Sequence, residues 1–206
     1  MEENYLLYRI VVFFFRLFCI TLHFPKINGK KNIPKKGKCI ICANHKSNID
    51  VVVLASFSPR TLHFMAKEEM FKNKFSNKFF RLLYSFPVRR TGAGIETFKK
   101  AISVLNNENV LTMFPEGRRV KEQFLDEGKM GCALIALKSK TNVVPIGIKG
   151  NYKPFKRITV NIGKEIDLSK YFNKKINKEI LREVTNLIME NISELSGISN
   201  KNYEGA

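Results

Sequence analysis

Short apolar runs alternate with amphipathic stretches along most of the chain after Pro34. Mainly apolar runs of this length are typical of strands buried on both faces, and we expect such strands at Cys39–Cys42, Thr61–Met65, Val110–Phe114 and Val143–Ile148. The stretches between and after these runs predict helices at residues 50–57, 95–105, 128–137 and 176–195. This alternation predicts the α/β class, with a mostly parallel, mixed sheet flanked by helices.

One later run has a different pattern. Residues 157–162 alternate strictly between polar and apolar side chains. Such alternation is typical of a strand with one face in solvent. We therefore expect a half-exposed strand near an edge of the sheet.

The N-terminal segment, residues 5–24, is almost wholly apolar and aromatic. About twenty helical residues at ~1.5 Å each reach the hydrocarbon thickness of a bilayer, so a single span is possible. Arg9, Arg16 and His23 recur every seven residues and share one stripe of a helix, which favours a helix lying in the membrane interface. A buried core helix is the alternative. A cleaved signal peptide fits poorly, because no small-residue cleavage site follows.

Six lysines follow this segment within residues 26–38. Positive charge beside a membrane segment favours the cytoplasmic side. The sequence thus predicts a membrane-associating helix over residues 1–28 and one globular domain over residues 29–206. We expect the protein at the cytoplasmic face of the cell membrane, either peripheral or monotopic, or with a single N-terminal span.

The net charge restricts the possible partners. The 206 residues include 36 Lys and Arg against 18 Asp and Glu, a formal charge of +18, which attracts anionic lipid, nucleic acid or phosphorylated substrates. The basic residues are spread along the chain and no nucleic-acid-binding motif is present, so we expect no nucleic-acid partner. A non-catalytic, membrane-tethered anion-binding protein is kept as a remote alternative. Cys39 and Cys42 lie in an apolar run and predict buried thiols.

A polar turn, NHKSNID, follows the first predicted strand at residues 44–50. Turns between a strand and a helix at the carboxyl edge are where open α/β sheets place their sites. The spacing lets the Asp50 carboxylate accept the His45 Nδ1 proton and leaves Nε2 facing outward as a base. On spacing alone, a helix cap by Asp50 or Ser47 competes with this interpretation. Ser47 lacks the G-x-S-x-G elbow of an exposed nucleophile.

Two further turns carry charge. FPEGRR, residues 114–119, follows another apolar strand and forms a rigid turn at the same expected edge. FPVRRTGAG, residues 86–94, places two arginines and glycines before a predicted helix. Helix-start amides and guanidinium groups together can bind phosphate.

NHxSxxD at residues 44–50, FPEG at 114–117 and VPI at 144–146, in this order, resemble the 1-acylglycerol-3-phosphate acyltransferase family of glycerolipid acyltransferases. The resemblance covers residues 29–150 and implies an acyltransferase domain. It implies that His45 is the general base and Asp50 its orienting partner. It also implies transfer from acyl-CoA or acyl-carrier protein to the sn-2 hydroxyl of lysophosphatidate, giving phosphatidate in phospholipid biosynthesis.

The expected partners are therefore membrane phospholipids, a lysophospholipid acceptor and the acyl donor. Beyond that donor we expect no cofactor, and no metal site. The catalytic motif does not separate lysophosphatidate from glycerol 3-phosphate or another lysophospholipid, so acyltransferases for those acceptors are the close alternatives.

The resemblance also implies a set of substrate-binding residues: Asn44, Ser47, Lys67, Arg90, Glu116, Gly117, Arg118 and Arg119. Arg90 matches the family's phosphate-binding arginine, with Lys67 as its helper. Arg118 departs from the family pattern, which has Thr or Ser there, while Arg119 takes the usual arginine place. A cation in place of a hydroxyl predicts either a more anionic substrate or a second salt bridge.

Overall fold

The computed structural model describes residues 3–88, 94–120 and 124–199. Within these ranges the strands are β1 (Lys26–Asn28), β2 (Cys39–Ala43), β3 (Leu62–Lys67), β4 (Ser85–Val88), β5 (Val110–Met113), β6 (Val143–Lys149) and β7 (Thr159–Ile162). They form one sheet in the order β1-β7-β6-β2-β5-β3-β4. Strands β6 and β7 pair antiparallel, whereas the other neighbours pair parallel. The predicted mostly parallel, mixed sheet is confirmed.

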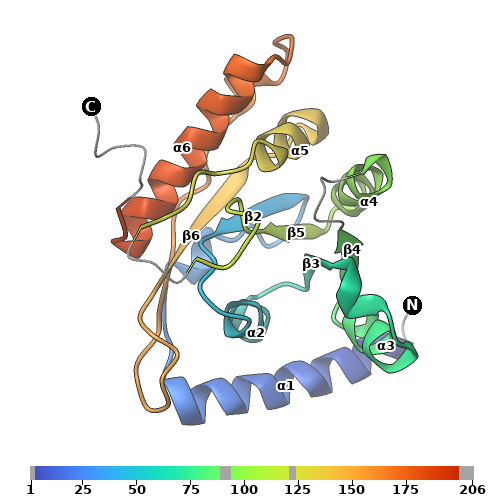
Figure 1. Ribbon diagram of the computed structural model, residues 1–206, viewed down its shortest axis with the longest axis vertical. Helices are drawn as coiled ribbons and strands as arrows, with labels where there is room; N and C mark the ends of the chain where they lie inside the picture. The colour runs from blue at the N-terminus through green and yellow to red at the C-terminus, as the bar shows by residue number, and fades with distance from the viewer. Residues whose placement is uncertain (1–2, 89–93, 121–123, 200–206) are drawn as a thin grey trace.

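Helices cover both faces of the sheet (Figure 1). In the described ranges they are α1 (Glu3–His23), α2 (Ile49–Phe57), α3 (Lys74–Leu82), α4 (Ile95–Asn106), α5 (Gly131–Ser139) and α6 (Lys178–Ser196), with short 3-10 turns at Lys30–Asn32, Glu68–Phe71 and Ser169–Tyr171. Helices α1 and α2 lie on one side, and α4, α5 and α6 on the other. The four predicted helices and the four strands predicted from apolar runs are present, although β3 is only partly buried, whereas β1, β4 and α3 were not predicted.

Strand β2 shows why the apolar runs of the sequence form the centre of the sheet. Every residue of β2 is buried. Ile40 and Cys42 pack with the α4, α5 and α6 side, while Cys39 and Ile41 pack with the α2 side. Because both faces are covered, no polar alternation remains. The cysteines are buried free thiols, as predicted.

Strands β2, β5 and β6 are parallel neighbours, so their carboxyl ends meet at one edge. Cys42 lies opposite Met113 of β5 on one side and Pro145 of β6 on the other. The turns that follow these three strands therefore gather at the same place. This register brings together segments more than 100 residues apart, such as Asn44 and Ile148.

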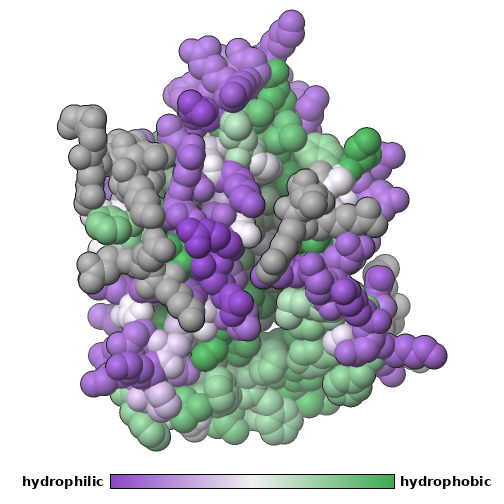
Figure 2. All heavy atoms as spheres, viewed as in Figure 1, coloured by the Kyte–Doolittle hydropathy of each residue, from purple (hydrophilic) through white to green (hydrophobic). Residues whose placement is uncertain are grey.

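Helix α1 lies lengthwise along the outside of α2 (Figure 1). Tyr8 and Cys19 face inward and are buried. The outward face is apolar and exposed, and its large side chains are Tyr5, Leu6, Leu7, Ile10, Phe13, Phe14, Leu17, Phe18 and Ile20. Figure 2 shows this apolar surface gathered along the side of the molecule that α1 forms. Since only 11% of the apolar stretch is buried, α1 is not a core helix, although it is long and apolar enough to cross a membrane.

The expected polar stripe of α1 is divided between surface and interior. Arg9 and Arg16 are exposed, and the Arg16 guanidinium lies 5.4 Å from the centre of the Phe57 ring in α2. His23 is buried at 2% exposure. Strand β1, which lies within the N-terminal segment expected at residues 1–28, pairs with β7. The sheet therefore begins before residue 29.

Candidate active site

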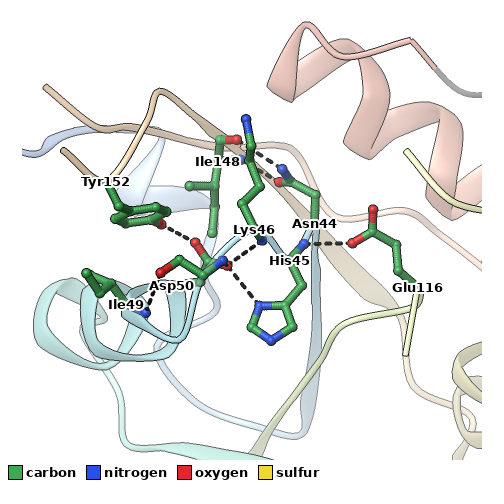
Figure 3. Close-up of polar contacts among 9 residues, drawn as sticks. Asn44, His45, Lys46, Ile49, Asp50, Glu116, Ile148 and Tyr152 are labelled. Atoms are coloured by element: carbon green, nitrogen blue, oxygen red, sulfur yellow. Dashed lines mark hydrogen bonds and ion pairs between the residues drawn. The ribbon is translucent and has the colours of Figure 1, made fainter. Parts of the chain in front are cut away.

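His45 and Asp50 form the hydrogen-bonded pair that their spacing allows and the family resemblance implies. His45 Nδ1 lies 2.8 Å from Asp50 Oδ2 (Figure 3). The turn after β2 carries His45, and the first turn of α2 carries Asp50, which is fully buried. The backbone N–H groups of Lys46 and Ser47 donate to the same Oδ2 at 2.7 and 2.8 Å. The carboxylate is thus fixed by the loop that holds the histidine.

The imidazole of His45 is held on a second side by Phe114. The two rings stack with centroids 4.0 Å apart and planes 17° from parallel. His45 Nε2 points away from Asp50 (Figure 3), and the side chain keeps 16% exposure. A histidine with Nδ1 bonded to a carboxylate and Nε2 free has the geometry of a general base.

The main chain of His45 forms hydrogen bonds with the FPEG turn and with Val120, which follows it. Its N–H donates to Glu116 Oε2 at 2.7 Å, and its carbonyl accepts from Val120 N–H at 2.8 Å. Glu116 is 2% exposed, and burial raises the pKa of its carboxyl to about 7. Its Oε1 has no hydrogen-bond partner within the described part of the chain. The two motifs therefore form one structural unit.

Gly117 closes the FPEG turn in a conformation that favours glycine. Its φ is +67°, in the left-handed region, and its N–H donates to the Phe114 carbonyl at 3.0 Å. A Cβ at this position would come within 2.8 Å of the Lys129 side chain. The Lys129 side chain thus lies over Gly117, a place that the sequence analysis did not predict.

The side chains of Asn44 and Ser47 are engaged within the protein. Asn44 Nδ2 donates to the Ile148 carbonyl at 3.0 Å, and Asn44 Oδ1 accepts from the Ile148 N–H at 2.7 Å. Asn44 is 1% exposed, so it joins the His45 loop to β6 and has no surface to offer a substrate. Ser47 Oγ accepts from Ile49 N–H at 3.2 Å, a contact at the start of α2. Neither Ser47 nor Asp50 is the cap of α2, whose N-cap is Asn48 without a side-chain cap hydrogen bond; Ser47 makes a local turn contact, and Asp50 holds the histidine.

The basic residues expected at the site differ in position. Arg118 Nε lies 2.5 Å from Asp126 Oδ2, so the second salt bridge expected from this departure is present. Arg119 is exposed. Lys67 ends β3 at the same edge of the sheet and lies opposite Val88 of β4. Arg90 lies outside the described residues.

Tyr152 is a site residue that the sequence analysis missed. It lies in the loop after β6, and its hydroxyl donates to Asp50 Oδ1 (Figure 3). Burial, together with the negative charge of Asp50, raises the pKa of Tyr152 above its ordinary value, which keeps the hydroxyl a donor. A spacing of 102 residues gives no local signal; only the pairing of β2 with β6 brings the two side chains together.

The chain matches the model of the Acyltransferase family over residues 25–149, which include the His45 and Glu116 turns. This match covers more than half of the chain, so the protein belongs to the Acyltransferase family, as the three motifs predicted. It is 32% identical over 126 residues to a 1-acyl-sn-glycerol-3-phosphate acyltransferase of Bacillus subtilis, covering 61% of this chain and 62% of the relative. It is 31% identical over 163 residues to the enzyme of that name from Streptococcus pneumoniae, covering 76% and 60%.

A solved structure shares the fold. The 1-acyl-sn-glycerophosphate (LPA) acyltransferase PlsC from Thermotoga maritima aligns with a TM-score of 0.63 and 25% identity, covering 83% of this chain and 72% of that chain. The chain spans about three fifths of the length of the two bacterial relatives that it matches.

Proposed function

We propose that this protein transfers an acyl group from an acyl thioester to the sn-2 hydroxyl of 1-acylglycerol 3-phosphate, giving phosphatidate for phospholipid synthesis. The observation that carries the proposal is the 2.8 Å contact between His45 Nδ1 and the buried Asp50, with Nε2 turned outward. The names of the two bacterial relatives support lysophosphatidate as the acceptor.

In the proposed reaction, His45 Nε2 takes the proton of the acceptor hydroxyl as its oxygen attacks the thioester carbonyl. The ester C–O bond forms and the C–S bond breaks, and the imidazolium returns the proton to the departing thiolate. Asp50 keeps the Nδ1 proton in place, so that Nε2 carries the lone pair. Acid and base help of this kind typically contributes about 10²- to 10⁴-fold. The mechanism needs no acyl-enzyme.

The acceptor phosphate requires cations near the same edge of the sheet. Lys67 at the end of β3 is suitably placed in the topology, and Arg90 is assigned from the sequence resemblance alone. In the turn beside His45, Gly117 and Arg119 are exposed, whereas Glu116 is buried and holds the His45 main chain. We assign Lys67, Arg90, Gly117 and Arg119 to substrate binding and Glu116 to the support of the turn. The formal charge of +18 suits either anionic donor, acyl-CoA or acyl-carrier protein.

The apolar outer face of α1 supports association with a membrane surface. Because α1 packs lengthwise on the domain, we place it in the interface, parallel to the bilayer, instead of across it. Helix α3 contacts α1 and exposes Phe75 at 85%, between Lys74 and Lys78. The lysines of residues 26–38 favour the cytoplasmic face.

The test is thiol release from acyl-CoA and from acyl-carrier protein, each with lysophosphatidate, glycerol 3-phosphate or a larger lysophospholipid as acceptor. His45→Ala should abolish turnover. As a control, His63→Gln, at a histidine of β3, should retain turnover. Turnover only with glycerol 3-phosphate would show that glycerol 3-phosphate, and not lysophosphatidate, is the acceptor. Turnover by folded His45→Ala would remove the assigned base. If the wild type releases no thiol with any donor and acceptor but binds anionic vesicles in a salt-sensitive way, the non-catalytic alternative is favoured.

A further inference from the structure

The catalytic carboxylate has two oxygens, and they are held by different parts of the chain. Asp50 Oδ2 accepts from His45 Nδ1 and from the amides of Lys46 and Ser47, all within the same loop. Asp50 Oδ1 accepts from the Tyr152 hydroxyl. A buried carboxylate oxygen without a donor is costly, so the tyrosine favours one rotation of the carboxylate. That rotation is the one in which Oδ2 faces the imidazole.

The loop that carries Tyr152 is bonded to the C-terminal end of α1. Phe155 N–H donates to the Leu22 carbonyl at 2.6 Å, and Ile158 N–H donates to the His23 carbonyl at 3.1 Å. The His23 ring meets the Tyr152 ring edge to face, with centroids 5.7 Å apart. The last turn of α1 therefore forms the support against which Tyr152 packs.

His23 takes part in this support through its ring. The side chain is 2% exposed, and its Nδ1 has no hydrogen-bond partner among the described residues. Because Nδ1 makes no hydrogen bond, we take the edge-to-face ring contact as the interaction through which His23 supports Tyr152. The same geometry can be supplied by an apolar ring of similar size.

We infer that Tyr152 is a positioning residue for the His45–Asp50 pair. The last turn of α1 must pack against the Tyr152 loop for the Tyr152 hydroxyl to hold Asp50. The membrane-associating helix is thereby linked mechanically to the catalytic carboxylate through His23 and Tyr152. The kinetic consequences of this inference rest on the proposed acyl transfer. Its geometric content does not, because it concerns the hydrogen bond between His45 and Asp50.

Nitrogen-15 labelling of histidine tests the geometry directly, because the chain has three histidines. His45 signals are assigned by their loss in His45→Ala. In Tyr152→Phe we expect the Nδ1-bound proton of His45 to shift upfield and broaden as the carboxylate loses its second anchor. Tyr171→Phe is the matched control, since Tyr171 also donates to a carboxylate, Glu183, on α6. Identical His45 signals in wild type and Tyr152→Phe would overturn the inference.

Two variants of His23 test the link to α1. His23→Ala removes the ring and should reproduce the His45 signals of Tyr152→Phe, whereas His23→Phe keeps a ring in place and should resemble the wild type. Melting curves establish that each variant folds. Wild-type His45 signals in folded His23→Ala would overturn the link.

Kinetics then separate this inference from the proposed function. In an active wild type, Tyr152→Phe should lower kcat about tenfold with little change in KM, the usual effect of losing one hydrogen bond to a charged group. A fall in kcat with unchanged His45 signals would contradict positioning. An inactive wild type in which Tyr152→Phe still alters the His45 signals would refute the proposed function and leave the role of Tyr152 supported.

Discussion

Glu116 accepts a hydrogen bond at 2.7 Å from the backbone N–H of His45, although 71 residues separate them in the chain. The FPEG turn therefore holds the main chain of the NHxSxxD turn, in addition to any contact with substrate. The contact is possible because β2 and β5 are parallel neighbours, so the turns that leave them meet at one edge of the sheet. The position of His45 depends on both.

Glu116 should make stability depend on pH. Its pKa in the folded protein is raised from 4.5 to about 7 by burial, so the native state keeps a proton that the unfolded state has lost between these values. The free energy of unfolding should therefore fall as pH rises through this window, by on the order of 3 kcal/mol. Urea unfolding of wild type and Glu116→Gln at several pH values measures this.

Glu116→Gln removes the titration and should show a flatter pH profile. Because the Gln carbonyl can still accept the His45 N–H, the variant should be at least as stable as the wild type above pH ~7. Glu194→Gln, the same change at an exposed carboxylate of α6, is the control and should keep the wild-type profile. Parallel profiles for wild type and Glu116→Gln would contradict the assigned cause.

Asp50→Asn should leave a folded protein with a badly oriented base. The side chain keeps its size, but an amide nitrogen placed at Oδ2 can no longer accept from His45 Nδ1. We expect kcat to fall by on the order of 10²- to 10⁴-fold with a smaller change in KM. Steady-state kinetics on a variant with wild-type circular dichroism is the measurement. A kcat within a few fold of the wild type would show that the pair is not used in the reaction.

The buried half of the fold could be predicted from sequence because burial on both faces leaves an uninterrupted apolar run, as in β2 and β6. Three elements gave no such signal. Strand β1 has three residues of mixed exposure, and β4 contains Pro87, which an edge strand tolerates. Helix α3 is amphipathic but short, and none of its residues is buried. The secondary structure of such short peripheral elements is determined by packing and pairing with neighbouring elements more than by their own hydrophobic pattern.

The candidate site divides in the same way. His45 and Asp50 lie within one turn, so their spacing allowed the hydrogen bond, and the family resemblance favoured it over a helix cap. Phe114 and Tyr152 reach the pair from the ends of β5 and β6, and only the strand order brings them there. Asn44 was expected to contact substrate, but the register of β2 with β6 places its amide on the Ile148 backbone. Motifs give residue types, while register determines what each side chain contacts.

Gly117→Ala should destabilise the FPEG turn. A φ of +67° costs an L residue about 1–2 kcal/mol, while the Lys129 side chain that the new Cβ meets can move aside. We expect the free energy of unfolding to fall by about that amount. Gly131→Ala is the matched control: nothing lies within 4 Å of its new Cβ, and α5 should gain up to about 1 kcal/mol in helix propensity. Equal effects of the two changes would contradict this account of the turn.

The outer face of α1 should determine membrane binding. Phe13 and Leu17 are 62% and 49% exposed on this face, and a buried apolar side chain of this size gains roughly 1.5–3 kcal/mol. Phe13→Gln combined with Leu17→Gln should therefore lower partitioning into anionic phospholipid vesicles by roughly 10²- to 10⁴-fold, measured by co-sedimentation. Ile95→Gln, at a residue 75% exposed on α4, should leave binding unchanged. Vesicle binding that survives the double change would place the membrane contact elsewhere on the protein.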